Sequence, residues 1–201
     1  MNLISEINIE SSFGFTDFMK VFIDQVEKPD LSNECEFKHY EKRKLNLHRT
    51  QKWLKIFKPS QELIDTVTLI NSPQNWMVIT ESWCGDSAQS LPIIVKTADL
   101  NPRINLKIIL RDSNPNIMDR YLTNGTKSIP KLIAFDEKGT ELFLWGPRPA
   151  EAKNLIMKLK NEGLEKSEIN KQLHLWYAKN KGTAMEKELI SLIKLVEIGK
   201  N

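Results

Sequence analysis

The feature that most constrains this chain is a change of pattern near Pro73, after which short apolar runs alternate with helical segments. Strands are predicted at 76–80, 106–110 and 131–135, where the runs are almost wholly apolar, and at 140–145, after a turn at 136–139. Helices are predicted at 84–99, where Pro92 is expected to interrupt the helix, at 116–122 and at 149–160. This order predicts an α/β domain in which a parallel βαβ unit and a hairpin share one mixed sheet with flanking helices.

The segments on either side of this region have helical patterns instead. Apolar residues recur at helical spacing over 15–26, 35–57 and 60–70, and Thr16 is a candidate N-cap for the first of these helices. Two further helical patterns lie between 167 and 196. We therefore expect a helical N-terminal extension at 1–72, a core at 73–164 and a C-terminal helical segment at 165–201 that packs on the core.

The composition is that of an ordinary globular domain that folds without disulfides. Of the 201 residues, 40% are hydrophobic and 27% are charged, and the net charge of +3 is too small to indicate a membrane or nucleic-acid partner. No run approaches the roughly 20 apolar residues that a membrane span needs. The first residues show no secretory pattern and there are only two cysteines. These features lead us to expect a protein of the reducing cytoplasm.

The chemistry of the chain centres on Cys84, which lies where the first strand gives way to a helix. Backbone amides and the positive end of the dipole at a helix start stabilise a thiolate, and such sites lower a cysteine pKa from about 8.5 to roughly 3.5–7.5. The amide and the hydroxyl of Ser87 are expected to add to this stabilisation. The carboxylates of Glu81 and Asp86 oppose it. The sequence therefore predicts a moderately lowered pKa for Cys84.

A second motif, Ile129-Pro130, immediately precedes the third predicted strand. Proline is confined to the start or the edge of a strand, and a proline placed here is expected to follow a cis peptide bond. The backbone of Ile129 would then lie beside the thiol, free to pair with an extended substrate.

Together these motifs resemble the thioredoxin family over residues 76–160. The resemblance implies the thioredoxin fold, with Cys84 as the nucleophilic cysteine, Pro130 as the cis-proline and Gly146 as the glycine that shapes the substrate groove beside Trp83. The sequence at 81–86, with Leu-Arg-Asp at 110–112 and Tyr-Leu-Thr-Asn-Gly at 121–125, is similar to a bacterial thioredoxin-like subgroup with a helical N-terminal extension.

The chain departs from the family at two positions that matter for redox chemistry. Ser87 stands where the family has its second cysteine, and Val78 stands where it often has a buried acid that accepts a proton. The motif Cys84-Gly85-Asp86-Ser87 therefore cannot form an internal disulfide. A mixed disulfide on Cys84 must be released by another thiol, for which glutathione is a candidate external reductant.

These residues predict a thiol oxidoreductase that acts through a single cysteine on the thiols or disulfides of proteins or small molecules, with no resident cofactor or metal and no membrane or nucleic-acid partner. The predicted catalytic residues are Cys84 and Ser87, and the predicted substrate-binding residues are Trp83, Gly85, Asp86, Ile129, Pro130 and Gly146. The alternatives are a redox-inactive peptide-binding or protein-binding module and a glutathione-linked thiol transferase. The pattern does not define an oligomeric state.

Two further features have competing interpretations. The segment 38–58 is strongly basic, and it is read either as the solvated face of an amphipathic helix, as a docking surface for an acidic partner, or as a nucleic-acid patch. Cys35 is read as an incidental helical cysteine in preference to a distant resolving thiol, since a disulfide needs Cα atoms within about 7 Å of each other.

Overall fold

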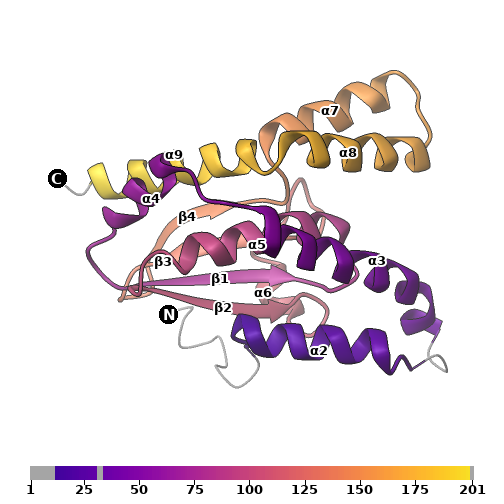
Figure 1. Cartoon of the computed structure of the whole chain (residues 1–201), viewed down its shortest axis with the longest axis horizontal. Coiled ribbons are helices and arrows are strands. Elements are labelled where there is room, and N and C mark those ends of the chain that lie inside the picture. The colour runs from indigo at the N-terminus through magenta and orange to yellow at the C-terminus, as the bar shows by residue number, and fades with distance from the viewer. Residues whose placement is uncertain (1–11, 31–33, 200–201) are drawn as a thin grey trace.

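The computed structural model of the chain describes residues 12–30 and 34–199, apart from the side chains of residues 35 and 36. In these described ranges, three helices come first, and a four-stranded sheet with its connecting helices follows (Figure 1). The elements are α2 (Phe15–Glu27), α3 (Glu34–Ile56), α4 (Gln61–Thr68), β1 (Gln74–Thr80), α5 (Gly85–Ala98), β2 (Ile104–Leu110), α6 (Pro115–Met118), β3 (Lys131–Phe135), β4 (Glu141–Trp145), α7 (Ala150–Asn161), α8 (Lys166–Asn180) and α9 (Thr183–Ile198).

The sheet has the strand order β2-β1-β3-β4. β1 runs parallel to β2, with Val78 opposite Ile108, and α5 connects the two strands. β3 pairs antiparallel with both β1 and β4. The mixed sheet predicted from the sequence is therefore confirmed, and with its flanking helices it has the thioredoxin fold.

Alternate side chains of β1 enter two separate apolar cores, one on each face of the sheet. Trp76 and Val78 join the larger core, which includes side chains of α2 to α5 and of α9. Met77 and Ile79 join the smaller core, which contains Cys84 and residues around α6. Because successive residues of a strand point to opposite faces, a strand buried on both faces is apolar throughout, as the sequence pattern indicated.

The helices before the sheet cover one of its faces and one of its edges. α2 lies beside β2, where Phe13 forms an isolated antiparallel bridge with Ile108, and α3 packs on α5 (Figure 1). Ser60 caps α4 by accepting a hydrogen bond from the amide of Leu63. The N-cap predicted at Thr16 is wrong: the cap residue of α2 is Gly14, and Thr16 lies inside the helix.

The C-terminal helix α9 is tied to the core by three of its glutamates. Glu188 accepts hydrogen bonds from the indole N–H of Trp145 and from the amide of Ala150, both at 2.6 Å. Glu186 accepts one from the amide of Ser60 at 2.6 Å, and Glu197 accepts one from the side chain of Gln74 at 2.8 Å. Two of these contacts span more than 100 residues of sequence, so α9 is held to the start of α4 and to the start of β1.

Helix α5 runs without a break through Pro92, contrary to the predicted interruption. Its residues are buried on nearly all sides, between the sheet, α3 and α9, so tertiary packing outweighs the local cost of the missing N–H.

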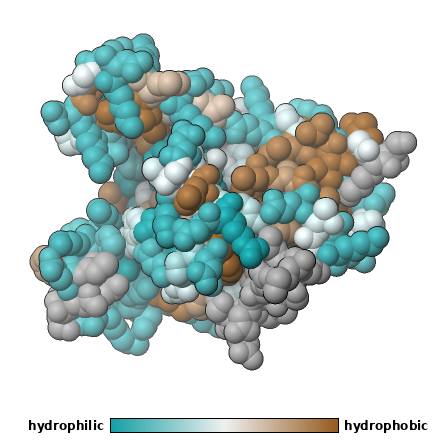
Figure 2. Space-filling model, turned by 180° about the vertical axis from the view of Figure 1, so that it is seen from behind, coloured by the Kyte–Doolittle hydropathy of each residue, from teal (hydrophilic) through white to brown (hydrophobic). Residues whose placement is uncertain are grey.

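Within the described ranges no helix is long and apolar enough to cross a membrane. Seen from behind, apolar side chains gather on the side of the molecule where α9 ends (Figure 2).

Candidate active site

Cys84 is the N-cap residue of α5, immediately after the loop that leaves β1. Its backbone amide donates to the carbonyl of Glu81, and its own carbonyl accepts from the amide of Ala88. The side chain is free for other contacts, and its Sγ donates a hydrogen bond of 3.4 Å to the carbonyl oxygen of Ile129. The predicted cis peptide bond between Ile129 and Pro130 is confirmed. The structure thus brings the thiol and the Ile129-Pro130 segment together.

The lowered pKa predicted for Cys84 is wrong in this structure. Cys84 is buried, and burial raises the pKa of the thiol, with a further contribution from the negative charge of Asp86. The backbone amides of Asp86 and Ser87 and the hydroxyl of Ser87 lower the pKa, but by less. The resting side chain at neutral pH is therefore the thiol.

Ser87 lies in the first turn of α5, close to the sulfur of Cys84. Its hydroxyl is buried and has no hydrogen-bond partner in the described structure. A hydroxyl buried without a partner is costly, and a thiolate at Cys84 would give it an acceptor. The position is consistent with the predicted stabilising role of Ser87, which stays a prediction.

Asp86 is a buried carboxylate whose two oxygens are both engaged. Its Oδ2 lies 2.5 Å from a guanidinium nitrogen of Arg148, and its Oδ1 accepts a hydrogen bond of 2.9 Å from the hydroxyl of Tyr177. Arg148 follows β4 and Tyr177 lies on α8, so this cluster joins the active-site helix to the C-terminal half of the chain. The contacts hold Asp86 in the wall of the site, and its predicted role in substrate binding stays a prediction.

Gly146 is the residue through which the end of β4 approaches the Ile129-Pro130 segment. Its φ is +121°, and a Cβ atom built on it would lie 2.2 Å from the backbone oxygen of Pro130. A glycine is therefore required here on two grounds, namely the backbone conformation and the space. The structure places Gly146 against Pro130, and its predicted role in shaping a substrate groove stays a prediction.

Trp83 and Gly85 flank the thiol and contact residues from distant helices. The indole of Trp83 stacks on the imidazole of His39 with ring centroids 4.7 Å apart, and the guanidinium of Arg111 lies 4.6 Å from the indole centroid. A Cβ atom on Gly85 would lie 3.2 Å from the imidazole of His174, which belongs to α8. Both helical extensions therefore reach the active site.

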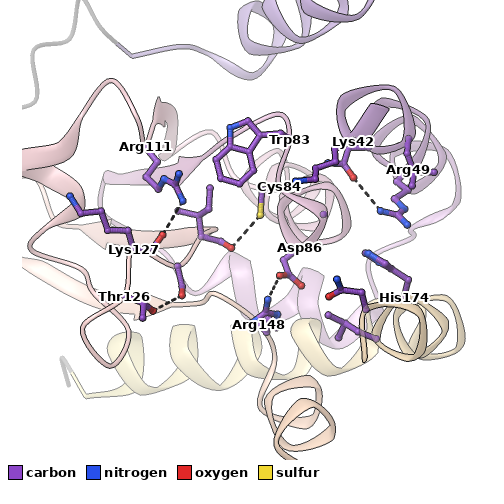
Figure 3. Close-up of a pocket in the computed structure, with 17 residues that line it drawn as sticks. Lys42, Arg49, Trp83, Cys84, Asp86, Arg111, Thr126, Lys127, Arg148 and His174 are labelled. Carbon is purple, nitrogen blue, oxygen red and sulfur yellow. Dashed lines mark hydrogen bonds and ion pairs between the residues drawn. The ribbon is translucent and has the colours of Figure 1, made fainter. Parts of the chain in front are cut away.

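Cys84 lines a pocket of about 620 Å³ that lies between α3, α8 and the loops at one end of the sheet (Figure 3). Five basic side chains line it, and Asp86 is its one acidic lining residue among those that the structure describes. The basic residues come from α3, from the loops after β2 and β4 and from the loop before β3, as follows: Lys42, Arg49, Arg111, Lys127 and Arg148. The pocket is therefore electropositive.

His174 also lines the pocket, but it carries no charge at neutral pH. Burial lowers its pKa to about 4, and the nearby positive charges of Arg49 and Arg148 lower it further, against the effect of Asp86. Its Nδ1 lies 3.4 Å from the side-chain nitrogen of Gln89. A neutral imidazole adds a polar wall to the pocket without adding to its charge.

Glu81 lies just before Cys84 and is itself buried. Its Oε1 accepts a hydrogen bond of 2.9 Å from the amide of Asp112. Burial raises its pKa to about 7, together with the charge of Asp112, while that hydrogen bond and the charges of Arg111 and Arg43 act in the opposite direction. This carboxyl group should make the stability of the fold depend on pH.

The expected pH dependence follows from the sign of the shift. A carboxyl with a folded pKa above its unfolded value binds more protons when folded, so its contribution to stability is complete below about pH 4.5 and is lost as the pH rises to about 7. The loss amounts to about 2–3 kcal/mol of unfolding free energy. Glu81→Gln should remove this dependence and stabilise the protein at pH 8, because the amide oxygen still accepts from Asp112.

Urea unfolding of both proteins at pH 5 and pH 8 measures this effect. The control is Glu137→Gln, which changes an exposed glutamate in the turn between β3 and β4. Equal pH dependence in wild type and Glu81→Gln would show that Glu81 ionises normally.

The comparisons with known proteins agree with the fold. A family model described as thioredoxin matches residues 34–162, which is well over half of the chain. The chain belongs to the thioredoxin family. The match begins at the start of α3 and so includes much of the segment that we predicted to be an extension.

Two solved structures share the fold. A crystal structure of a protein of unknown function from Pseudomonas aeruginosa is 18% identical, with a TM-score of 0.56 over 77% of this chain and 84% of the other. An HIV epitope scaffold is 19% identical, with a TM-score of 0.53 over 77% of this chain and 85% of the other. No match was found among curated proteins.

Sequence reasoning missed the residues that the helical extensions bring to this thioredoxin-like site. Arg49 comes from α3, and His174 and Tyr177 come from α8. None of them lies in a motif. The one available signal was the basic segment 38–58, whose residues 42, 45, 46 and 49 recur at helical spacing and line the pocket.

Proposed function

We propose that this protein is a thiol oxidoreductase that works through the single nucleophile Cys84. The observation that carries the proposal is the position of the sulfur: it lies at the N-cap of α5, 3.4 Å from the carbonyl of Ile129, and it lines an open pocket. In a thioredoxin fold this is the meeting point of a thiol, helix amides and a backbone segment able to hold a substrate. The resemblance of the sequence around Cys84 to a bacterial thioredoxin-like subgroup supports the same function.

The proposed reaction has two thiol–disulfide exchange steps. Cys84 loses its proton, and the thiolate attacks one sulfur of a disulfide, so that a bond forms between Cys84 and that sulfur while the other leaves as a thiolate and takes up a proton. A second thiol, supplied by glutathione or by another small thiol or protein, then attacks the mixed disulfide. This attack displaces the sulfur of Cys84, which takes up a proton and becomes the free thiol again. The second thiol and the group that Cys84 carried leave together as a new disulfide, so the enzyme is neither oxidised nor reduced over the cycle.

Other residues of the site assist this chemistry. Ser87 and the amides at the start of α5 would stabilise the thiolate, and the Ile129 carbonyl would orient the sulfur. The Pro130 and Gly146 contact fixes the wall opposite the thiol, and Trp83 closes one side. Because the second step requires a thiol, the proposal places the protein in a reducing compartment such as the cytoplasm.

The raised pKa of Cys84 favours a second candidate function. A buried thiol that stays protonated at neutral pH is a weak nucleophile, and the site would then be a binding module that has lost redox turnover. The two candidates differ in whether a covalent adduct forms and is released.

The proposal predicts that bis(2-hydroxyethyl) disulfide forms a mixed disulfide on Cys84 and that glutathione releases it in repeated turnovers. Intact-mass spectrometry should show one added group, and peptide mapping should assign it to Cys84. Below the pKa of the thiol, the rate of adduct formation should rise about tenfold per pH unit, since it follows the thiolate fraction. A protein that gains no adduct between pH 7 and pH 9 would be the binding module instead.

A further inference from the structure

The pocket beside Cys84 is enclosed on two sides by helices that flank the strand core. α3 contributes one wall through Lys42 and Arg49, and α8 contributes another through His174 (Figure 3). Its volume of about 620 Å³ lies within the range of sites that hold small molecules. A space of this size has room for a compact ligand next to the thiol.

Three of the five positive charges that face this pocket are balanced by ion pairs within the protein, and two are not. Arg111 pairs with Asp112 at 2.7 Å, Lys127 with Asp119 at 2.7 Å and Arg148 with Asp86 at 2.5 Å. Lys42 and Arg49 form no ion pair with any residue that the structure describes. Both lie on the face of α3 that is turned toward Cys84.

Of these two cations, Arg49 gives the stronger evidence for an anionic ligand, because its side chain is half-buried. One of its guanidinium nitrogens donates a hydrogen bond of 3.2 Å to the side-chain oxygen of Asn46, and its nearest neighbours at the pocket include the uncharged His174. The negative charge of Asp86 acts on Arg49, but no described carboxylate forms an ion pair with it. A partly buried guanidinium without such a pair can bind an incoming carboxylate through two parallel hydrogen bonds.

A second observation points to the same ligand. The Nε atom of Arg148 is buried at this pocket without a hydrogen-bond partner, although the other end of its guanidinium is paired with Asp86. A second donor without an acceptor therefore belongs to a side chain that lines the same pocket as the sulfur.

We infer that the substrate of Cys84 is a negatively charged, low-molecular-mass thiol or disulfide, whose carboxylates are bound by Arg49 and Lys42. The inference rests on the proposed function for the exchange step, and it adds the substrate class. It also accounts for the basic segment of α3: the side of this helix that faces Cys84 is a binding wall rather than a solvated face.

Three symmetric disulfides of similar size test the inference: 3,3′-dithiodipropionate, bis(2-hydroxyethyl) disulfide and cystamine, which carry two carboxylates, two hydroxyls and two ammonium groups. The rate constant for adduct formation at Cys84 should be at least about fivefold higher for the dicarboxylate than for the diol, and lowest for cystamine. Arg49→Gln should abolish the preference for the dicarboxylate over the diol. The matched control is Lys55→Gln, which removes one positive charge from the last turn of the same helix, away from the pocket.

Alkylation separates failure of the inference from failure of the proposed function, since it needs no disulfide exchange. Cys84 should react faster with the anionic reagent iodoacetate, relative to the neutral reagent iodoacetamide, than a free thiol does. The ratio of the two rate constants should be about fivefold higher for Cys84 than for 2-mercaptoethanol, and Arg49→Gln and Lys42→Gln should each lower this ratio. A preference for iodoacetate in alkylation without disulfide exchange would overturn the proposed function and keep the inference that the pocket binds anions. Equal rates with all three disulfides, unchanged in Arg49→Gln, would overturn the inference and keep the oxidoreductase. Thermal unfolding of each variant verifies that it is folded.

Discussion

Replacement of Cys84 by serine is expected to reduce disulfide turnover to the rate of the uncatalysed reaction between glutathione and the substrate. A serine hydroxyl has almost no anionic form at neutral pH and does not undergo disulfide exchange, so neither step of the cycle remains. The expected loss is on the order of a thousandfold or more. Steady-state assays with bis(2-hydroxyethyl) disulfide and glutathione measure it.

The serine variant should nevertheless fold as the wild type does. Serine is close to cysteine in size, and its hydroxyl can donate to the Ile129 carbonyl that the thiol contacts at 3.4 Å. We expect the unfolding free energy to change by no more than about 1 kcal/mol. A loss of turnover without a loss of stability would assign the effect to chemistry.

The matched control is Cys35→Ser, which removes the other cysteine of the chain. Cys35 lies in the first turn of α3, and its side chain is outside the described residues. If Cys84 works alone, Cys35→Ser retains full turnover. Loss of turnover in Cys35→Ser would instead show that Cys35 resolves the mixed disulfide.

The strands were the most predictable part of this protein, because local sequence determines them. The predicted bounds of β3 at 131–135 agree with the structure, since all five residues are buried and the run ends at a turn. β1 and β2 each start two residues earlier than predicted. Their first residues pair with each other as Gln74 with Ile104 and Asn75 with Asn105, so pairing, not hydrophobicity, extends the strands.

The centre of the site was predictable because it is carried by short motifs. Cys84, the cis bond before Pro130 and the glycine at 146 are all read from local sequence, and the structure brings them together. The pKa of Cys84 was not predictable in the same way. It depends on burial and on the charge of Asp86, and burial results from tertiary packing of segments that are remote in sequence.

The walls of the pocket were not predictable for a related reason. Arg49 and His174 are separated by more than 120 positions, and each looks like an ordinary polar residue of a helix. Only the docking of α3 and α8 on either side of α5 makes them neighbours of one thiol (Figure 3). The interpretation of 38–58 as a solvated face was therefore incomplete, because the part of it that faces Cys84 lines the pocket.

The Gly146→Ala substitution is expected to lower the free energy of unfolding by about 3 kcal/mol or more. Alanine at a φ of +121° is strained, which costs about 1–3 kcal/mol, and its Cβ would lie 2.2 Å from the backbone oxygen of Pro130. Backbone atoms cannot move aside as the end of a flexible side chain can, so β4 or the segment before β3 must shift, at a further cost of about 1–3 kcal/mol. Urea unfolding measures the sum.

Gly163→Ala separates the two contributions. Gly163 also has a positive φ, of +77°, but a Cβ atom there would meet nothing within 4 Å. This variant should cost only about 1 kcal/mol, the strain of the left-handed conformation alone. If both variants lose the same stability, the close approach to Pro130 contributes nothing. If Gly146→Ala loses more and its Cys84 thiol is also alkylated faster, the contact between Gly146 and Pro130 is what keeps the wall opposite the sulfur in place.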